Sequence, residues 1–128
     1  MTIEHKELLQ QYFELQQVGG WIALQKIPEF DLKGFGTKRI AKLVDHHLLQ
    51  FTIGATKLGA SKQLNNTIRN IIRMEGAEVV EGFTTNGGSK PKKQYPSIHL
   101  SKVNHHKIDR IILQVLGAVK QVQCEDST

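Results

Sequence analysis

Hydrophobic residues recur every three or four positions in four parts of the chain, and this spacing is typical of amphipathic helices. The predicted helices are residues 2–17, 37–50, 62–75 and 104–122. Each begins at or beside a residue whose side chain can accept a hydrogen bond from the first helical turn, namely Thr2, Thr37, Ser61 and Asn104. Glycines follow the first and third of these helices, at positions 19–20 and 76, and such glycines commonly end a helix.

Three further segments have the patterns of strands or turns. The sequences AEVVEGF at 77–83 and YPSIHLS at 95–101 alternate between apolar and polar residues, and the segment between them is rich in glycine and lysine. They predict a β-hairpin with a basic tip. Residues 21–27 predict a short strand or a helical turn, followed by a connection that contains Pro28 and two glycines. Helices together with a hairpin predict an α+β fold.

The predicted helix at 62–75 has one apolar side and one polar side that lacks acids. Its apolar side consists of Leu64, Ile68, Ile71 and Ile72. Its opposite side carries Lys62, Gln63, Asn66, Arg69, Asn70 and Arg73. Arg and Lys can bind guanine or phosphate, and Asn and Gln can read adenine, so this side is suited to DNA. The alternative is an ordinary solvated helix face, but such faces usually mix Glu with Lys.

The residues before this helix have the spacing of a helix-turn-helix. Ala55, Leu58, Gly59 and Ser61 follow the pattern A-x-x-L-G-x-S, and Gly76 lies fifteen residues after Ser61. With Ile68 and Ile72 at the buried positions of the second helix, residues 36–102 resemble the winged helix-turn-helix family of DNA-binding domains. The resemblance implies a short first helix near 52–58, a recognition helix at 62–75 and a wing at 84–94. The chain departs from the family pattern at Asn65, where an apolar residue is usual.

If the resemblance holds, the basic residues outside the recognition helix also contact DNA. Lys90, Lys92 and Lys93 would lie in the wing against the DNA backbone. Lys38 and Arg39 would add a basic face to the helix predicted at 37–50. The alternative is that the three wing lysines lie in a mobile surface loop that does not bind DNA.

The predicted C-terminal helix carries one continuous apolar stripe of about four turns. Its members include Ile108, Ile111, Ile112, Val115, Leu116 and Val119. MarR-like and PadR-like winged-helix regulators use C-terminal helices to dimerise, and palindromic DNA sites favour twofold proteins. We therefore expect these six residues at a homodimer interface, with packing on the chain's own first helix as the alternative.

Charge is distributed unevenly along the chain, which has a net charge of +5. The segment from Lys33 to Lys107 contains thirteen Lys and Arg but four Asp and Glu, and the remaining residues are net acidic. A basic centre is typical of a module that binds a polyanion. We divide the chain into an N-terminal helix and connection (1–32), a winged-helix core (33–102), a packing or dimerisation helix (103–123) and a tail (124–128).

Other classes of function have little support in the sequence. The single cysteine, Cys124, excludes an intramolecular disulfide, and the sequence has neither a membrane-length apolar run nor a signal peptide, so we expect a cytoplasmic protein without a membrane partner. No nucleophile, carboxylate pair or phosphate loop has a usable spacing, so we expect no enzyme activity and no cofactor. The adjacent pairs His46-His47 and His105-His106 cannot form the i, i+4 ligand pair of a zincin, and we expect no metal.

The sequence therefore predicts a protein that binds double-stranded DNA as a dimer, most simply a small transcriptional regulator. Two alternatives stay open. One is an RNA-binding or ribosome-associated basic domain, and the other is a winged helix used for protein assembly or for plasmid or phage replication and segregation.

Overall fold

The computed structural model describes residues 2–18, 21–26, 39–44, 47–51, 61–84 and 93–126. Its helices are α1 (Ile3–Gln10), α2 (Ser61–Met74) and α3 (His105–Asp126), with a short 3₁₀ turn, η2, at Leu100–Lys102. Its strands are β1 (Phe13–Val18), β2 (Trp21–Lys26), β3 (Arg39–Val44), β4 (Leu48–Phe51), β5 (Val80–Thr84) and β6 (Lys93–His99). The predicted α+β class is confirmed.

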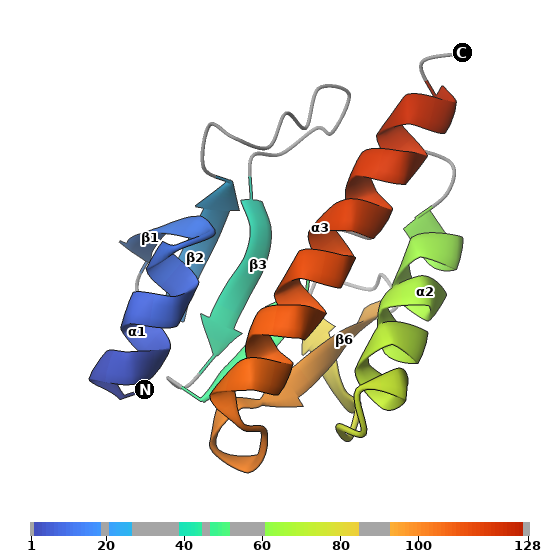
Figure 1. The fold of residues 1–128 in the computed structure, drawn as a ribbon. Helices are drawn as coiled ribbons and strands as arrows, with labels where there is room; N and C mark the ends of the chain where they lie inside the picture. The colour runs from blue at the N-terminus through green and yellow to red at the C-terminus, as the bar shows by residue number, and fades with distance from the viewer. Residues whose placement is uncertain are drawn as a thin grey trace.

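The strands form one antiparallel sheet in the order β1-β2-β3-β4-β6-β5. The first four strands are neighbours in sequence order, and α2 then leads to the β5–β6 hairpin, in which β6 pairs with β4. All three helices lie on one face of the sheet, with α3 between α1 and α2 (Figure 1). This layering buries the apolar side of each helix against one face of the sheet.

The core lies between the helices and the sheet. Alternate strand residues face it, so Leu43, Leu49 and Ile98 are fully buried, and cross-strand pairs such as Leu49 and Ile98 lie opposite each other. The helices contribute Leu9 from α1 and Leu64, Ile68 and Ile72 from α2. At the turn between α1 and β1, the Tyr12 hydroxyl donates to the Asp109 carboxylate on α3, and burial raises the pKa of Tyr12 to about 12.

The first predicted helix is wrong in its second half, where a strand replaces it. Helix α1 ends at Gln10, and β1 pairs with β2 from Phe13 to Val18. Phe13 is buried whereas Glu14 is exposed, which is the period-two pattern of a strand. The two glycines after Val18 separate paired strands by two residues, and a Gly-Gly loop of that length is a hairpin signal that can be mistaken for a helix end.

The helix predicted at 37–50 is also wrong, because β3 and β4 form an antiparallel pair there. Ala41 and Leu43 are buried on β3, and Leu49 and Phe51 are buried on β4. A short apolar-rich segment satisfies helical and strand patterns equally well, and the neighbouring strands β2 and β6 decide between them. Arg39, expected on a basic helical face, therefore begins a strand, and Lys38, its expected neighbour on that face, lies outside the described residues.

Four later elements match the sequence analysis. Helix α2 and strands β5 and β6 lie where they were predicted, and so does α3, whose first turn is capped by the Asn104 carboxamide oxygen, 2.9 Å from the Lys107 backbone nitrogen. The short helix expected near 52–58 and most of the wing lie outside the described residues. A winged-helix core is not established by the remainder.

The apolar stripe of α3 lies inside the chain and not on its surface. The stripe packs in the same core as the sheet, α1 and α2. Its residues, each at most 2 % exposed, are Ile108, Ile111, Ile112, Val115, Leu116 and Val119. The homodimer interface expected on this stripe therefore finds no support in the structure, since a second subunit could reach these residues only if the core opened. The stripe instead packs within the chain, which was the alternative prediction. Its contacts extend well beyond the first helix.

Candidate nucleic-acid interface

The polar side of α2 faces away from the core. Gln63, Asn66, Asn70 and Arg73 are exposed, while residues on the opposite side of the helix are buried. The four lie three or four residues apart, so they form one continuous strip along a helix of 14 residues, about 21 Å long. The exposure of these four residues agrees with the polar side predicted from the sequence.

Arg69 differs from the other members of the predicted face, because its guanidinium is held by a neighbouring strand. Its Nε and Nη2 atoms donate to the two carboxylate oxygens of Glu81 on β5, at 2.8 and 3.0 Å. The side chains of Arg69 and Glu81 are only 17 % and 33 % exposed. A two-pronged contact of this kind fixes the guanidinium plane. Arg69 therefore fastens α2 to β5, and the expectation that it reaches DNA finds no support in this arrangement.

The same guanidinium also orients Asn66. Its Nη1 atom donates to the Asn66 carboxamide oxygen at 2.9 Å. Because arginine has only hydrogen-bond donors, the oxygen of Asn66 must face Arg69, and the NH₂ group takes the other position. Asn66 thus presents two N–H donors on the exposed side of α2. This arrangement could not be predicted from the sequence, since Glu81, which holds Arg69, lies twelve residues beyond it and on a different element.

The C-terminal end of α2 is fixed by backbone geometry. Gly76 has a φ of +79°, its N–H donates to the Arg73 carbonyl, and the Ala77 N–H donates to the Ile72 carbonyl. This is the double hydrogen bond of a Schellman motif, which requires a left-handed residue after the helix. The predicted helix stop at Gly76 is correct.

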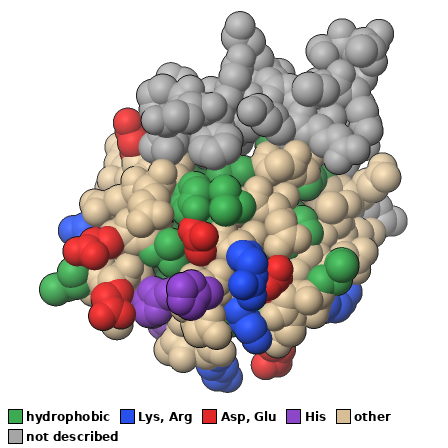
Figure 2. Space-filling view, in the orientation of Figure 1, with side chains coloured by type: hydrophobic (Ala, Val, Ile, Leu, Met, Phe, Trp, Pro, Cys, Tyr) green, Lys and Arg blue, Asp and Glu red, His purple; other side chains and the backbone are tan. Residues whose placement is uncertain are grey.

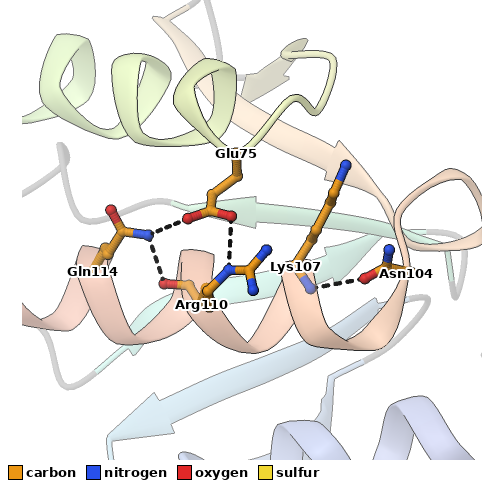
Figure 3. Close-up of polar contacts among 5 residues, drawn as sticks. All are labelled: Glu75, Asn104, Lys107, Arg110 and Gln114. Carbon is orange, nitrogen blue, oxygen red and sulfur yellow. Dashed lines mark hydrogen bonds and ion pairs between the residues drawn. The ribbon is translucent and has the colours of Figure 1, made fainter.

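Side chains then join this end of α2 to α3 (Figure 3). Glu75 accepts from Arg110 Nε at 2.8 Å and from Gln114 Nε2 at 2.9 Å. These hydrogen bonds, Arg110's first, hold the pKa of the Glu75 carboxyl below its usual value. Together with the buried side of α2, these contacts position the exposed strip relative to the rest of the fold.

The other basic residues predicted to bind DNA cannot be placed at this surface. Lys90 and Lys92 lie outside the described residues, and the side chains of Lys62 and Lys93 are outside the description as well. On the face in Figure 2, Lys and Arg are interspersed with Asp and Glu and do not form a uniform basic patch. The contribution of α2 to a nucleic-acid surface thus comes mainly from amides and Arg73.

Histidines meet in pairs that the sequence did not suggest. The rings of His5 and His105 stack with centroids 4.6 Å apart, and those of His47 and His99 are 4.7 Å apart. The partners are far apart in sequence, so no local pattern could reveal them. Within the described part of the chain, no group of three His, Cys, Asp or Glu residues could hold a metal ion.

Comparisons with known proteins add no relative. The chain matches no protein-family profile, no curated protein and no solved structure. None of the helices in the described ranges is both long and apolar enough to span a bilayer.

Proposed function

We propose that this protein binds double-stranded DNA and that α2 is the element that enters the major groove. The observation that carries the proposal is the exposed strip of three amides and one arginine on a helix without a carboxylate, at Gln63, Asn66, Asn70 and Arg73. An α-helix with its side chains is about 10–12 Å wide, close to the roughly 12 Å width of the major groove of B-DNA.

The chemistry of the strip suggests different tasks for its members. Asn70 can use its oxygen and its NH₂ together, which is the arrangement that reads adenine. Asn66 offers mainly donors and so fits acceptors on a base edge, such as guanine O6 and N7 or thymine O4. Arg73 in the last turn can bind a guanine or a phosphate.

The wing lysines belong to the same proposal. The order of α2, β5 and β6 is that of the recognition helix and wing in winged-helix domains, so Lys90, Lys92 and Lys93 would contact the DNA backbone beside α2. The simplest role is that of a small transcriptional regulator in the cytoplasm. Since the α3 stripe is occupied within the chain, the proposal requires no dimer through that helix.

The test is selection from a random duplex pool, followed by binding measurements on the selected site. Asn66→Ala and Asn70→Ala should each lower the preference for that site by roughly 1–3 kcal/mol, because each removes contacts to a base edge. Binding to unrelated duplexes should change little, since phosphate contacts supply most of it. Fluorescence anisotropy at two salt concentrations measures both quantities.

Gln10→Ala is the matched control, because Gln10 is an exposed amide on a different helix. It should leave both affinities unchanged. Tighter binding to single-stranded or structured RNA of the same length would replace DNA by RNA as the ligand. Unchanged site preference in both asparagine variants would remove α2 as the reading element.

A further inference from the structure

One titratable side chain, His5, is buried near the start of helix α1. Helix α1 has eight residues, and only His5 and Leu9 among them are buried. His5 is 7 % exposed and occupies the third position of the helix, where its side chain takes part in the N-terminal cap. The attachment of α1 therefore depends on few groups, and one of them titrates near neutral pH.

The cap requires the neutral form of His5. The Thr2 hydroxyl accepts from the His5 backbone N–H at 3.1 Å, and the Thr2 backbone N–H in turn donates to Nδ1 of His5 at 3.5 Å. This reciprocal arrangement is a capping box with histidine in the place of the usual Glu or Gln. Nδ1 can accept a hydrogen bond only while it carries no proton, since both ring nitrogens of the imidazolium are donors. Protonation thus removes half of the capping box.

The docking of α1 on α3 opposes protonation as well. The ring of His5 stacks on His105 with an interplanar angle of 19°, so two charged rings would face each other at a centroid distance of 4.6 Å. The other charged groups near His5 are Glu4, which also lies 3.6 Å from His105 Nε2, and the terminal amino group. Of these only Glu4 favours the charged ring. On the neighbouring face of α3, Asp109 is occupied by the Tyr12 hydroxyl.

We propose that His5 and His105 form an acid-sensitive clasp, which holds α1 on α3 at neutral pH and releases α1 on mild acidification while the sheet, α2 and α3 stay folded. The larger core supports this separation, because α2 and α3 pack on the sheet through many fully buried residues that do not titrate. Release of α1 would uncover the apolar surface beneath Leu9.

The direction of the pH dependence follows from the charge balance. Burial first, and then the charges of His105 and the terminal amino group, lower the pKa of His5 from its ordinary value of 6.5. The docked state thus binds fewer protons than the released state below that pH. Docking of α1 is at full strength above pH 6.5 and weakens as the pH falls from there through the lowered pKa.

Amide hydrogen exchange, corrected for its intrinsic pH dependence, tests the proposal on the full chain. Between pH 7.5 and pH 5, protection of residues 3–10 should fall by roughly fivefold or more, the factor that corresponds to the typical cost of losing a helix N-cap. Protection in α2 should stay nearly constant. Equal loss in both helices would mean global unfolding, and constant protection in α1 would mean that no clasp exists; either result overturns the proposal.

Variants separate the clasp from general acid sensitivity. His5→Gln keeps a side chain that can complete a capping box but cannot be protonated, so α1 should stay protected at pH 5. His105→Gln removes the facing charge and should move the loss of protection to lower pH. His106→Gln, at an exposed position next to His105, is the control and should behave like the wild type. An unchanged acid response in both His5→Gln and His105→Gln would assign the response to other groups.

Discussion

At the scale of single residues, the contact that most affects the proposed recognition surface is the one between Arg69 and Glu81. Glu81 fixes the guanidinium, and the guanidinium fixes the oxygen of Asn66. Glu81→Gln should therefore relax the base preference at the position read by Asn66 by up to about tenfold, because the amide can then turn over. The preference read by Asn70 should persist. Site selection with the variant protein measures both.

Glu78→Gln is the control for this prediction. Glu78 is an exposed carboxylate three residues earlier, and its substitution removes the same charge. If both variants change selection equally, the effect is electrostatic and Asn66 is not positioned through Glu81. The stability of Glu81→Gln should fall by only about 1 kcal/mol, because the ion pair is partly exposed to solvent.

At the scale of the elements, two glycines predict opposite effects of the same substitution. Gly76 ends α2 with a φ of +79°, which an L side chain adopts only with strain, and a Cβ there would lie 3.4 Å from the Lys107 ammonium nitrogen. Gly76→Ala should lower the free energy of unfolding by about 1–2 kcal/mol. Gly117 lies within α3 with open space around it. Gly117→Ala should therefore raise the free energy of unfolding by up to about 1 kcal/mol.

Urea unfolding of the two variants measures this difference directly. A neutral or stabilising Gly76→Ala would show that α2 does not end in the left-handed turn. A destabilising Gly117→Ala would show that this side of α3 is covered by another molecule in solution.

At the scale of the whole molecule, the burial of α3 changes what a charge in its stripe would do. Val115 is fully enclosed by the chain's own core, so Val115→Asp would place a carboxylate among apolar groups. We expect this change to lower the free energy of unfolding by about 4 kcal/mol or more, which is enough to unfold a domain of this size. The sequence alone suggested instead that the change would separate a dimer. Circular dichroism would show the loss of helix and sheet together.

Leu113→Asp is the matched control, because Leu113 is 47 % exposed on the same helix. This variant should stay folded, with a free energy of unfolding within about 1 kcal/mol of that of the wild type. If Val115→Asp stayed folded and merely changed its oligomeric state by light scattering, the stripe would be an interface after all.

The sequence by itself determined the elements whose pattern is long and agrees with their surroundings. Helix α2 has a sharp division between Ile68 or Ile72 on one side and Asn66 or Asn70 on the other, and a helix with such a division packs in only one orientation. The helix end at Gly76 and the cap at Asn104 depend on residues nearby in the sequence, so they too could be predicted from it. The exposed part of the candidate site was predicted for the same reason, whereas DNA binding itself stays a prediction.

The tertiary structure alone decided the features that depend on distant partners. Strands β3 and β4 form where a helix was expected because β2 and β6 supply hydrogen bonds on either side, and strand pairing depends on residues far apart in sequence. The α3 stripe fits a subunit interface or an internal core equally well until the sheet exists to cover it. The role of Arg69 and the pairing of His5 with His105 likewise arise only when the fold brings separate elements together, because a side chain's charge environment is set by its neighbours in space and not by its neighbours in sequence.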